Sequence, residues 1–177
     1  MVVSSGERIV LEEISEKDID GLFKCYSNQN AMSTFGRKPV ETKDEALGII
    51  RQNIKMKEEN TGIRYAAKLK DTKEFAGFIT LKRYNSIDFR TEIDYLVLPE
   101  YQGKGIASEM LHLLLKISKS WKLERITAYV DLNNLASCKL LEKANFKNEG
   151  ILRSWVRDGD SFYDVYSFSF LLSDFKN

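Results

Sequence analysis

The residues best suited to chemistry in this sequence form a short loop that contains Gly103 and Gly105. The loop follows a strand-like apolar run that ends at Leu98, and it leads into an amphipathic helix. Glycine has no Cβ, so the backbone of such a loop can approach an anion closely, and the first unpaired N–H groups of the helix point at that anion. The sequence therefore predicts a phosphate cradle, which suits a ligand that carries a diphosphate.

Two other interpretations of this loop stay open on the residues alone. An ordinary strand-to-helix turn also uses two glycines. The run from Gly103 to Ser108 also approaches the dinucleotide-binding pattern G-x-G-x-x-G/A, with Glu124 at a distance suited to a ribose contact. This run lacks the third small residue, however, and it follows a strand meander instead of opening a strand, helix, strand unit.

The elements that must position the loop are indicated by the period of the apolar residues. Apolar residues recur every four positions from Gly105 to Trp121, which predicts a helix packed on a sheet by one face. A strand from Arg125 to Val130 follows that helix, so the strands on either side of the helix should be parallel neighbours. The expected strands cover residues 8–11, 63–69, 75–84, 91–98, 125–130, 151–156 and 162–171; the expected helices begin near Ser15 and Thr42, where capping patterns occur, and cover residues 105–121 and about 135–144.

Composition limits the class of protein. A chain of 177 residues with 43% hydrophobic residues suits one packed domain, which we expect over residues 1–177. With 27 basic and 26 acidic residues, the net charge does not indicate a nucleic-acid partner. Cys25, Cys138 and His112 have no metal-site spacing, so we expect no metal, reduced thiols and a cytoplasmic location. No apolar stretch approaches the ~20 residues that span a bilayer, so no membrane association is expected.

Two blocks of the sequence carry a resemblance to a known family. The run Gln102-Gly103-Lys104-Gly105-Ile106-Ala107 resembles the acetyl-coenzyme-A (acetyl-CoA) signature of the GNAT N-acetyltransferase superfamily. Residues 134–137 and 141–146 resemble the second conserved block of that superfamily, at the expected distance downstream. Residues 91–98 and 159–164 further resemble the RimJ/RimL-like branch, which acetylates the amino termini of ribosomal proteins.

The resemblance covers nearly the whole chain and implies an α/β (α+β) fold. In that fold a single domain has a mixed, mostly antiparallel sheet with helices on both faces, and a splayed parallel strand pair forms the cofactor cleft. One position departs from the family pattern, because Asn145 stands where the family usually has glycine. Asparagine tolerates the left-handed conformation that ends a helix, so the same fold is expected.

The resemblance also implies which residues bind acetyl-CoA. Leu96, Val97 and Leu98 would offer their backbone to the pantetheine arm as if it were an added strand, although their side chains are expected in the core. Lys104 would add a positive charge and Ser108 a hydroxyl at the diphosphate. The full expected set is Leu96, Val97, Leu98, Gln102, Gly103, Lys104, Gly105, Ile106, Ala107, Ser108 and Asn134.

Two catalytic residues are expected from the same resemblance. Glu92 is the candidate base, with Asp94 as the alternative on the same strand face. Ser137 is the candidate proton donor to the CoA thiolate, and Asn134 would bind the pantetheine or that hydroxyl. Each also has a structural interpretation: Glu92 as a salt-bridged strand residue, Asn134 as a helix N-cap and Ser137 as a first-turn residue.

The predicted function is direct transfer of an acetyl group from acetyl-CoA to a primary amine. An α-amine with a pKa near ~8 is about one-tenth neutral at pH 7, whereas a lysine amine near ~10.4 is almost wholly charged, so a weak base suffices for the α-amine of a protein. A polyamine or aminated antibiotic is the alternative acceptor, and a non-catalytic acyl-CoA-binding regulator is the alternative outside enzymes. We expect residues 26–40 and 155–163 to line the acceptor pocket and a homodimer to be possible.

Overall fold

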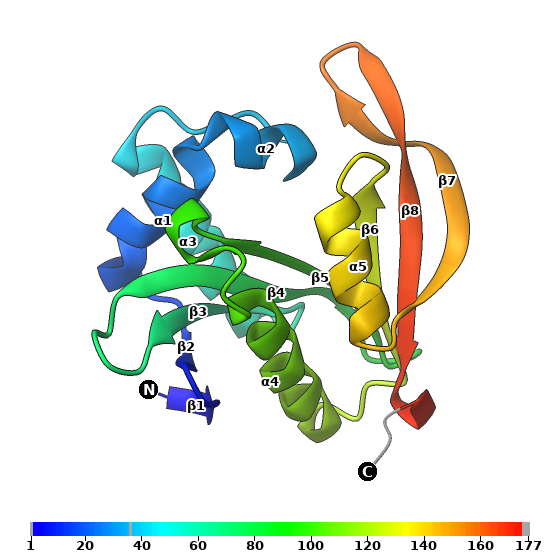
Figure 1. The fold of residues 1–177 in the computed structure, drawn as a ribbon, viewed down its shortest axis with the longest axis horizontal. Helices are drawn as coiled ribbons and strands as arrows, with labels where there is room; N and C mark the ends of the chain where they lie inside the picture. The colour runs from blue at the N-terminus through cyan, green and yellow to red at the C-terminus, as the bar shows by residue number, and fades with distance from the viewer. Residues whose placement is uncertain (1, 36, 175–177) are drawn as a thin grey trace.

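An eight-stranded sheet runs through the computed structural model, which describes residues 2–35 and 37–174 (Figure 1). The domain expected over residues 1–177 therefore extends beyond the described residues at both ends. The strands are β1 (Val2–Ser5), β2 (Ile9–Glu13), β3 (Ile63–Leu69), β4 (Phe75–Asn85), β5 (Arg90–Val97), β6 (Arg125–Asp131), β7 (Lys147–Asp158) and β8 (Ser161–Leu171). The α-helices are α1 (Ile19–Ser27), α2 (Gln29–Phe35), α3 (Lys43–Glu58), α4 (Ile106–Ser120) and α5 (Leu135–Lys143).

The sheet is mixed, as expected. Its strand order is β1-β2-β3-β4-β5-β6-β8-β7. Among the described strands, β5 and β6 form the parallel pair, and every other neighbouring pair is antiparallel. The parallel relation follows from the crossover through α4, which returns the chain to the same end of the sheet before β6 begins.

Helices cover both faces of this sheet, which confirms the predicted fold class. On one face α4 packs over the strands, and its buried side chains Met110, Leu111 and Leu114 share a core with Ile93 and Val97 of β5. On the other face α1, α2 and α3 share a second core with Phe78 of β4 and Leu96 of β5. Because successive residues of a strand point to opposite faces, β5 contributes to both cores.

The local signals for helix ends are confirmed at two positions. Thr42 caps α3, where its hydroxyl accepts a hydrogen bond from the Glu45 N–H at 3.3 Å. Asn145 adopts the left-handed conformation after α5, with a φ of 64°. At Ser15 the expected capping contact also forms, but it opens a 3-10 turn over Glu16–Asp18 that precedes α1.

Two elements were missed and one prediction was wrong. Strand β1 has exposed side chains and a bulged register, and α2 buries only Met32 among the described residues, so neither produces a clear apolar period. The first predicted strand, residues 8–11, is displaced to Ile9–Glu13. Phe162 of β8 is 59% exposed, because it lies near the tip of the β7–β8 hairpin, beyond the part of β8 that pairs with β6.

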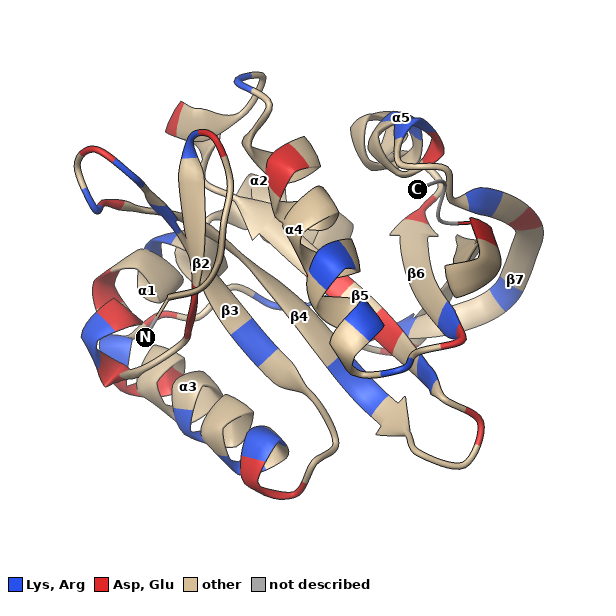
Figure 2. Ribbon diagram, turned by 90° about the horizontal axis from the view of Figure 1, so that it is seen from below, with Lys and Arg blue, Asp and Glu red and all other residues tan. Residues whose placement is uncertain are grey.

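Charged residues of both signs alternate over the ribbon (Figure 2). A basic position on β4 lies beside acidic positions on β5 (Figure 2), and Lys82 pairs with Glu92 there. Among the described residues, no helix is both long enough and apolar enough to span a membrane. Cys25 is buried in α1 and Cys138 is partly buried in α5, and both are free thiols.

Candidate functional site

The loop between β5 and α4 forms the predicted cradle. Gly103 and Gly105 have φ angles of +72° and +79°, which glycine adopts without strain, and a Cβ on Gly103 would meet only open space. The first helical bond joins the Glu109 N–H to the Gly105 carbonyl at 3.0 Å. Within the described part of the chain, the N–H groups of residues 103–108 have no hydrogen-bond acceptor, so six consecutive amides are free to bind an anion.

The predicted cradle residues differ in what their side chains do. Ile106 is only 3% exposed, because its side chain packs in the core under α4, so only its amide faces the loop. The Gln102 Nε2 donates to the Val97 carbonyl at 3.0 Å and ties the loop to the end of β5. The ammonium of Lys104 lies 5.8 Å from the centre of the Tyr101 ring. The side chains of Ala107 and Ser108 lie in the first turn of α4, half-buried and exposed respectively.

Strands β5 and β6 pair in parallel over their first residues and then diverge. Their register ends with Ile93 opposite Ala128, while β5 continues along β4 until Val97 pairs with Gly77. We call this divergence the strand fork: residues 94–97 of β5 and 129–131 of β6. The edge of β5 within the fork has no strand partner among the described residues, as the predicted cofactor cleft requires.

The three backbone positions predicted at this edge are not equivalent. The Leu98 N–H donates to the Ala76 carbonyl at 2.9 Å, so it faces β4. Because antiparallel pairing alternates, Leu96 also directs its peptide groups to β4, whereas those of Tyr95 and Val97 face the fork. Val97 is thus the predicted residue whose backbone lies at the fork, and Tyr95 is a second one that the sequence analysis did not identify.

The hydroxyl groups of Tyr95 and Ser137 meet across the fork, with 2.6 Å between Tyr95 Oη and Ser137 Oγ. Burial raises the pKa of Tyr95 to about 12, so its phenol keeps its proton at neutral pH. Asn134 caps α5 by accepting a hydrogen bond from the Ser137 N–H at 3.1 Å. The capping role considered for Asn134 is therefore present, and it fixes the orientation of the first turn that carries Ser137.

Glu92 and Asp94 lie on the opposite face of β5 from Tyr95. Both oxygens of Glu92 accept hydrogen bonds from Arg83 Nη1, at 3.2 and 3.0 Å, and the Arg83 side chain is 71% exposed. Glu92 is therefore salt-bridged, as its structural interpretation supposed, and the pair is a weak one because Arg83 projects into solvent.

Asp94 is held more tightly than Glu92. Its Oδ2 accepts a hydrogen bond from Lys82 at 2.8 Å, and its Oδ1 lies 3.6 Å from the buried guanidinium of Arg64. Burial raises the pKa of Asp94, but the positive charges of Lys82 and Arg64 outweigh burial and hold that pKa below its ordinary value. A carboxylate with a lowered pKa is a weaker base, so Asp94 is less suited than Glu92 to accept a proton.

Aromatic residues line the same side of the fork as Glu92. Thr127 pairs with Glu92, so Tyr129, two residues further along β6, shares that face. The ring of Tyr129 lies 5.1 Å from that of Trp155, which comes from one of the segments predicted to line an acceptor pocket. In the other predicted segment, Gly36 lies outside the described residues, and α2 contacts β6.

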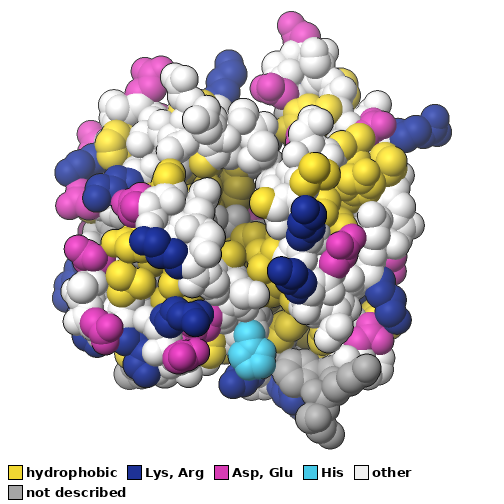
Figure 3. All heavy atoms as spheres, in the orientation of Figure 1, with side chains coloured by type: hydrophobic (Ala, Val, Ile, Leu, Met, Phe, Trp, Pro, Cys, Tyr) yellow, Lys and Arg dark blue, Asp and Glu magenta, His cyan; other side chains and the backbone are white. Residues whose placement is uncertain are grey.

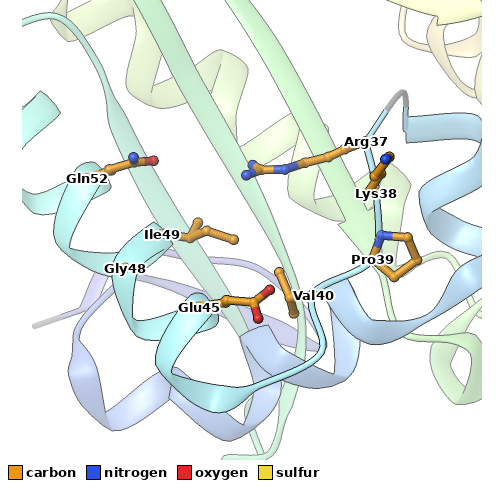
Figure 4. A pocket seen from close by; sticks show the side chains of 8 residues that line it. All are labelled: Arg37, Lys38, Pro39, Val40, Glu45, Gly48, Ile49 and Gln52. Carbon is orange, nitrogen blue, oxygen red and sulfur yellow. The ribbon is translucent and has the colours of Figure 1, made fainter. Parts of the chain in front are cut away.

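Figure 3 shows apolar side chains at the floor of a hollow on the face that carries α4 and α5. A different groove, of about 530 Å³, lies between α3 and the segment 37–40 (Figure 4). Its lining residues are Arg37, Lys38, Pro39, Val40, Glu45, Gly48, Ile49 and Gln52. The first four belong to the segment 26–40 that was expected to line the acceptor pocket, whereas none of the eight is a predicted catalytic or cofactor-binding residue. In the part of the chain that the structure describes, no cluster of His, Cys, Asp and Glu is arranged to hold a metal ion.

Comparison with known proteins identifies relatives with the same arrangement. The model of the acetyltransferase (GNAT) domain matches residues 8–147. The uncharacterized N-acetyltransferase YoaA of Bacillus subtilis is 32% identical over 92% of this chain and 93% of its own length. The spermidine N-acetyltransferase of Vibrio cholerae, solved in complex with CoA and spermine, has a TM-score of 0.83 and 25% identity over 93% of this chain and 96% of that one.

A third similar structure shares the fold at lower identity. It is an acetyltransferase from Salmonella typhimurium that modifies the N-terminal serine of the 50S ribosomal subunit protein L7/L12. The TM-score is 0.87, with 17% identity over 97% of this chain and 99% of that chain. At this identity the likeness shows the fold alone.

Replacing glycine by alanine should have opposite effects at the cradle and in α3. Gly105→Ala should lower the free energy of unfolding by about 1–2 kcal/mol, because a side chain at positive φ is strained, and a Cβ there would also lie 2.9 Å from Arg8 Nη1. Gly48→Ala should raise it by about 0.5–1 kcal/mol, because Gly48 is helical and a Cβ there meets nothing within 4 Å. Urea unfolding of the two variants measures both changes, and equal effects would contradict the left-handed assignment.

Proposed function

The chain belongs to the acetyltransferase (GNAT) domain family, and we propose that its acceptor is the α-amine of a protein N-terminus, such as that of a ribosomal protein. As a member of this family it is an N-acetyltransferase that uses acetyl-CoA as the acetyl donor. The free amides of residues 103–108 fit this donor, because they present a surface for the phosphates of CoA. The identity of the acceptor is the part that is proposed.

The charge balance on the face of β5 that carries Glu92 and Asp94 is the observation that carries the proposal. Glu92 is paired with Arg83, and Asp94 is paired with Lys82 and Arg64. A polyamine brings several ammonium groups and would need carboxylates without basic partners, whereas three basic side chains around two carboxylates repel a polycation. A protein N-terminus brings one amine followed by neutral peptide groups, which these charges tolerate.

The strength of the available bases supports the same acceptor. Lys82 and Arg64 hold the pKa of Asp94 below its ordinary value, so this carboxylate is a weak base. An α-amine with a pKa near ~8 already has a useful neutral fraction at pH 7, so a weak base or a water relay is sufficient. A primary amine of a polyamine, with a pKa closer to that of lysine at ~10.4, would need more help.

The proposed mechanism assigns one proton to each face of β5. The amine nitrogen attacks the thioester carbonyl, a C–N bond forms, and Glu92 accepts the proton that the nitrogen loses. The C–S bond breaks as the tetrahedral intermediate collapses, and the departing thiolate takes a proton from the Ser137 hydroxyl, which Tyr95 supports through their 2.6 Å contact. Solvent then returns a proton to the hydroxyl pair, and Glu92 releases its proton to solvent, which completes the cycle. The Val97 and Tyr95 peptide groups hold the donor's arm at the fork, and residues 103–108 with Lys104 hold its phosphates.

A polyamine acceptor is the second candidate, because the chain is 25% identical to the spermidine N-acetyltransferase of Vibrio cholerae over almost its full length. For that acceptor, Glu92 and Asp94 would have to release their basic partners when the substrate binds. Both candidates use the same donor and the same proton donor on α5. The two acceptors differ in how many positive charges they carry in addition to the reacting amine.

Location and assembly complete the proposal. Two free thiols, Cys25 and Cys138, suit a reducing compartment such as the cytoplasm.

The β7–β8 hairpin exposes Ile151, Trp155 and Phe162, with 50%, 48% and 59% of each accessible, and an exposed apolar edge of this kind favours a homodimer. Sedimentation velocity should detect a dimer at micromolar concentration, and a Phe162→Ser variant should shift it toward monomer; a wild-type protein that stays monomeric would contradict the dimer.

An acceptor panel tests the proposed function. Short peptides with a free N-terminus should release CoA thiol with a kcat/KM at least tenfold above that of spermidine, and peptides with a blocked N-terminus and a free lysine should be poor acceptors. Thiol release detected with a chromogenic disulfide measures all three. A higher kcat/KM for spermidine would overturn the protein acceptor and favour the second candidate.

The same assay tests the role of Glu92. Glu92→Gln should lower kcat about 100-fold at pH 7, within the range for loss of a general base. The loss should shrink toward pH 9, because the α-amine then deprotonates in solution. Arg153→Gln, on the exposed strand β7, is a control that should leave kcat unchanged. An equal loss at both pH values would mean that Glu92 is structural.

Variants of the hydroxyl pair test the proton donor. Ser137→Ala should lower kcat about 100-fold while binding of CoA changes little, because the departing thiolate loses its donor. Tyr95→Phe should lower kcat by less than Ser137→Ala does if Tyr95 only supports Ser137. It should lower kcat by more if Tyr95 is itself the donor. Since the pKa of Tyr95 is about 12, neither hydroxyl should cause an alkaline fall in kcat below pH 10. Unchanged turnover in both variants, with calorimetric binding intact, would remove this pair from the mechanism.

A further inference from the structure

Arg8 lies beside the cradle, although it is about one hundred residues away in the sequence. Its Nη1 would be 2.9 Å from a Cβ placed on Gly105, the N-cap of α4. The guanidinium therefore occupies the space that a side chain at Gly105 would need. No pattern near residue 8 indicated a contact with the loop at residues 102–108.

The backbone of Arg8 is fixed against α4. Its N–H donates to Glu109 Oε1 at 2.8 Å, and the neighbouring Ile9 N–H donates to the same oxygen at 3.2 Å. Its carbonyl accepts a hydrogen bond from the Lys70 N–H at 2.8 Å. The first two bonds hold the start of β2 on the first turn of α4, the third ties it to the end of β3, and together they set where the Arg8 side chain begins.

The guanidinium itself is much less constrained. Its nearest carboxylate oxygens are Glu109 Oε2 at 3.8 Å and Glu7 Oε2 at 3.9 Å, both beyond hydrogen-bond distance, and 52% of the side chain is exposed. It donates no hydrogen bond to any of the residues that the structure describes. A guanidinium has five N–H donors in a fork that matches the oxygens of a phosphate, and here all five are free for a ligand.

The positive charge of Arg8 is repelled by the N-terminus of α4 unless an anion is bound between them. The N-terminus of a helix carries a partial positive charge, and the six free amides of residues 103–108 concentrate it at this loop. A guanidinium beside them is repelled, and Glu109 offsets this only in part because its Oε1 is used by two backbone amides. A phosphate bound between the amides and the guanidinium would turn that repulsion into attraction from both sides.

We propose that Arg8 is a phosphate-binding residue of the acetyl-CoA site. It would complete the cradle at Gly105 and form charge-assisted hydrogen bonds to a phosphate of CoA. This inference rests on the use of acetyl-CoA and is independent of which amine is the acceptor. CoA carries both a diphosphate and a 3′-phosphate on its ribose, and the chemistry at Arg8 suits either group.

Calorimetry with three ligands tests the proposal on the full chain. Arg8→Gln should weaken CoA binding about tenfold, the loss expected for one charge-assisted hydrogen bond. Binding of pantetheine, which has no phosphate, should be unchanged. Arg8→Lys should retain part of the affinity because it keeps the charge. Arg51→Gln is the matched control, since Arg51 on α3 is also exposed, at 66% against 52% for Arg8, and pairs with Glu16, away from the cradle.

Dephospho-CoA, which lacks the 3′-phosphate, identifies the group that Arg8 binds. If Arg8→Gln also weakens dephospho-CoA binding about tenfold, Arg8 binds the diphosphate. If Arg8→Gln leaves dephospho-CoA binding unchanged, Arg8 binds the 3′-phosphate. Both results support the proposal. CoA affinity within twofold of wild type in Arg8→Gln would overturn it. An equal loss for pantetheine would also overturn it, because Arg8 would then act only by supporting the fold around α4.

Discussion

The divergence of β5 from β6 after Ile93 and Ala128 is the constraint on which the rest of the site depends. Each strand stays paired on its other side: β5 follows β4 to Val97, and β6 follows β8 to Asp131. The two halves of the sheet are therefore anchored separately, and twist accumulated across the sheet can open the gap between them without breaking either ladder. Only a strand edge that no neighbour covers can offer its peptide groups to an extended ligand arm.

The fork also explains why one short strand can serve two proton transfers. Residues that alternate along β5 point to opposite faces, so Glu92 and Asp94 face the α1–α3 side while Tyr95 faces the α4–α5 side. Glu92 lies opposite Thr127, one pair before the parallel register ends, so it is at the base of the fork, and Asp94 is the first residue of the fork on β5. Beyond that point only β5 itself lies between the two faces, so in the proposed mechanism groups on the two faces act on neighbouring atoms of a single reacting centre.

How much the sequence could predict depends on whether a signal was local. Gly103 and Gly105 indicate a left-handed backbone, and Thr42 and Asn145 indicate helix ends. These features can therefore be predicted from the residues at and near each position. The period of β3 to β5 and of α4 predicts their faces for the same reason. The expected parallel pair and its splay came from the crossover and from the family resemblance, and both are found in the sheet.

The features that the sequence did not reveal depend on contacts between distant segments. Tyr95 looks like an ordinary core residue of a strand, and only the approach of α5 places Ser137 within 2.6 Å of it. The pairing of Glu92 with Arg83 requires the bulge in β4, where the register shifts between Lys82 and Asn85 and Arg83 has a φ of +53°. Arg8 reaches Gly105 because β2 packs under α4. Such contacts follow from three-dimensional register and have no local pattern.

The chemistry of Cys138 bears on whether the acetyl group passes through the enzyme. This thiol follows Ser137 in α5, and a thiol is a group that can form an acyl intermediate. Burial and the charge of Glu142 raise its pKa, so the nucleophilic thiolate is scarce at neutral pH. An acyl-carrying cysteine needs the opposite environment, with a nearby base or positive charge that lowers its pKa. The site instead places a carboxylate and a hydroxyl pair on either side of an open strand edge, and that arrangement suits direct attack of the amine within a ternary complex.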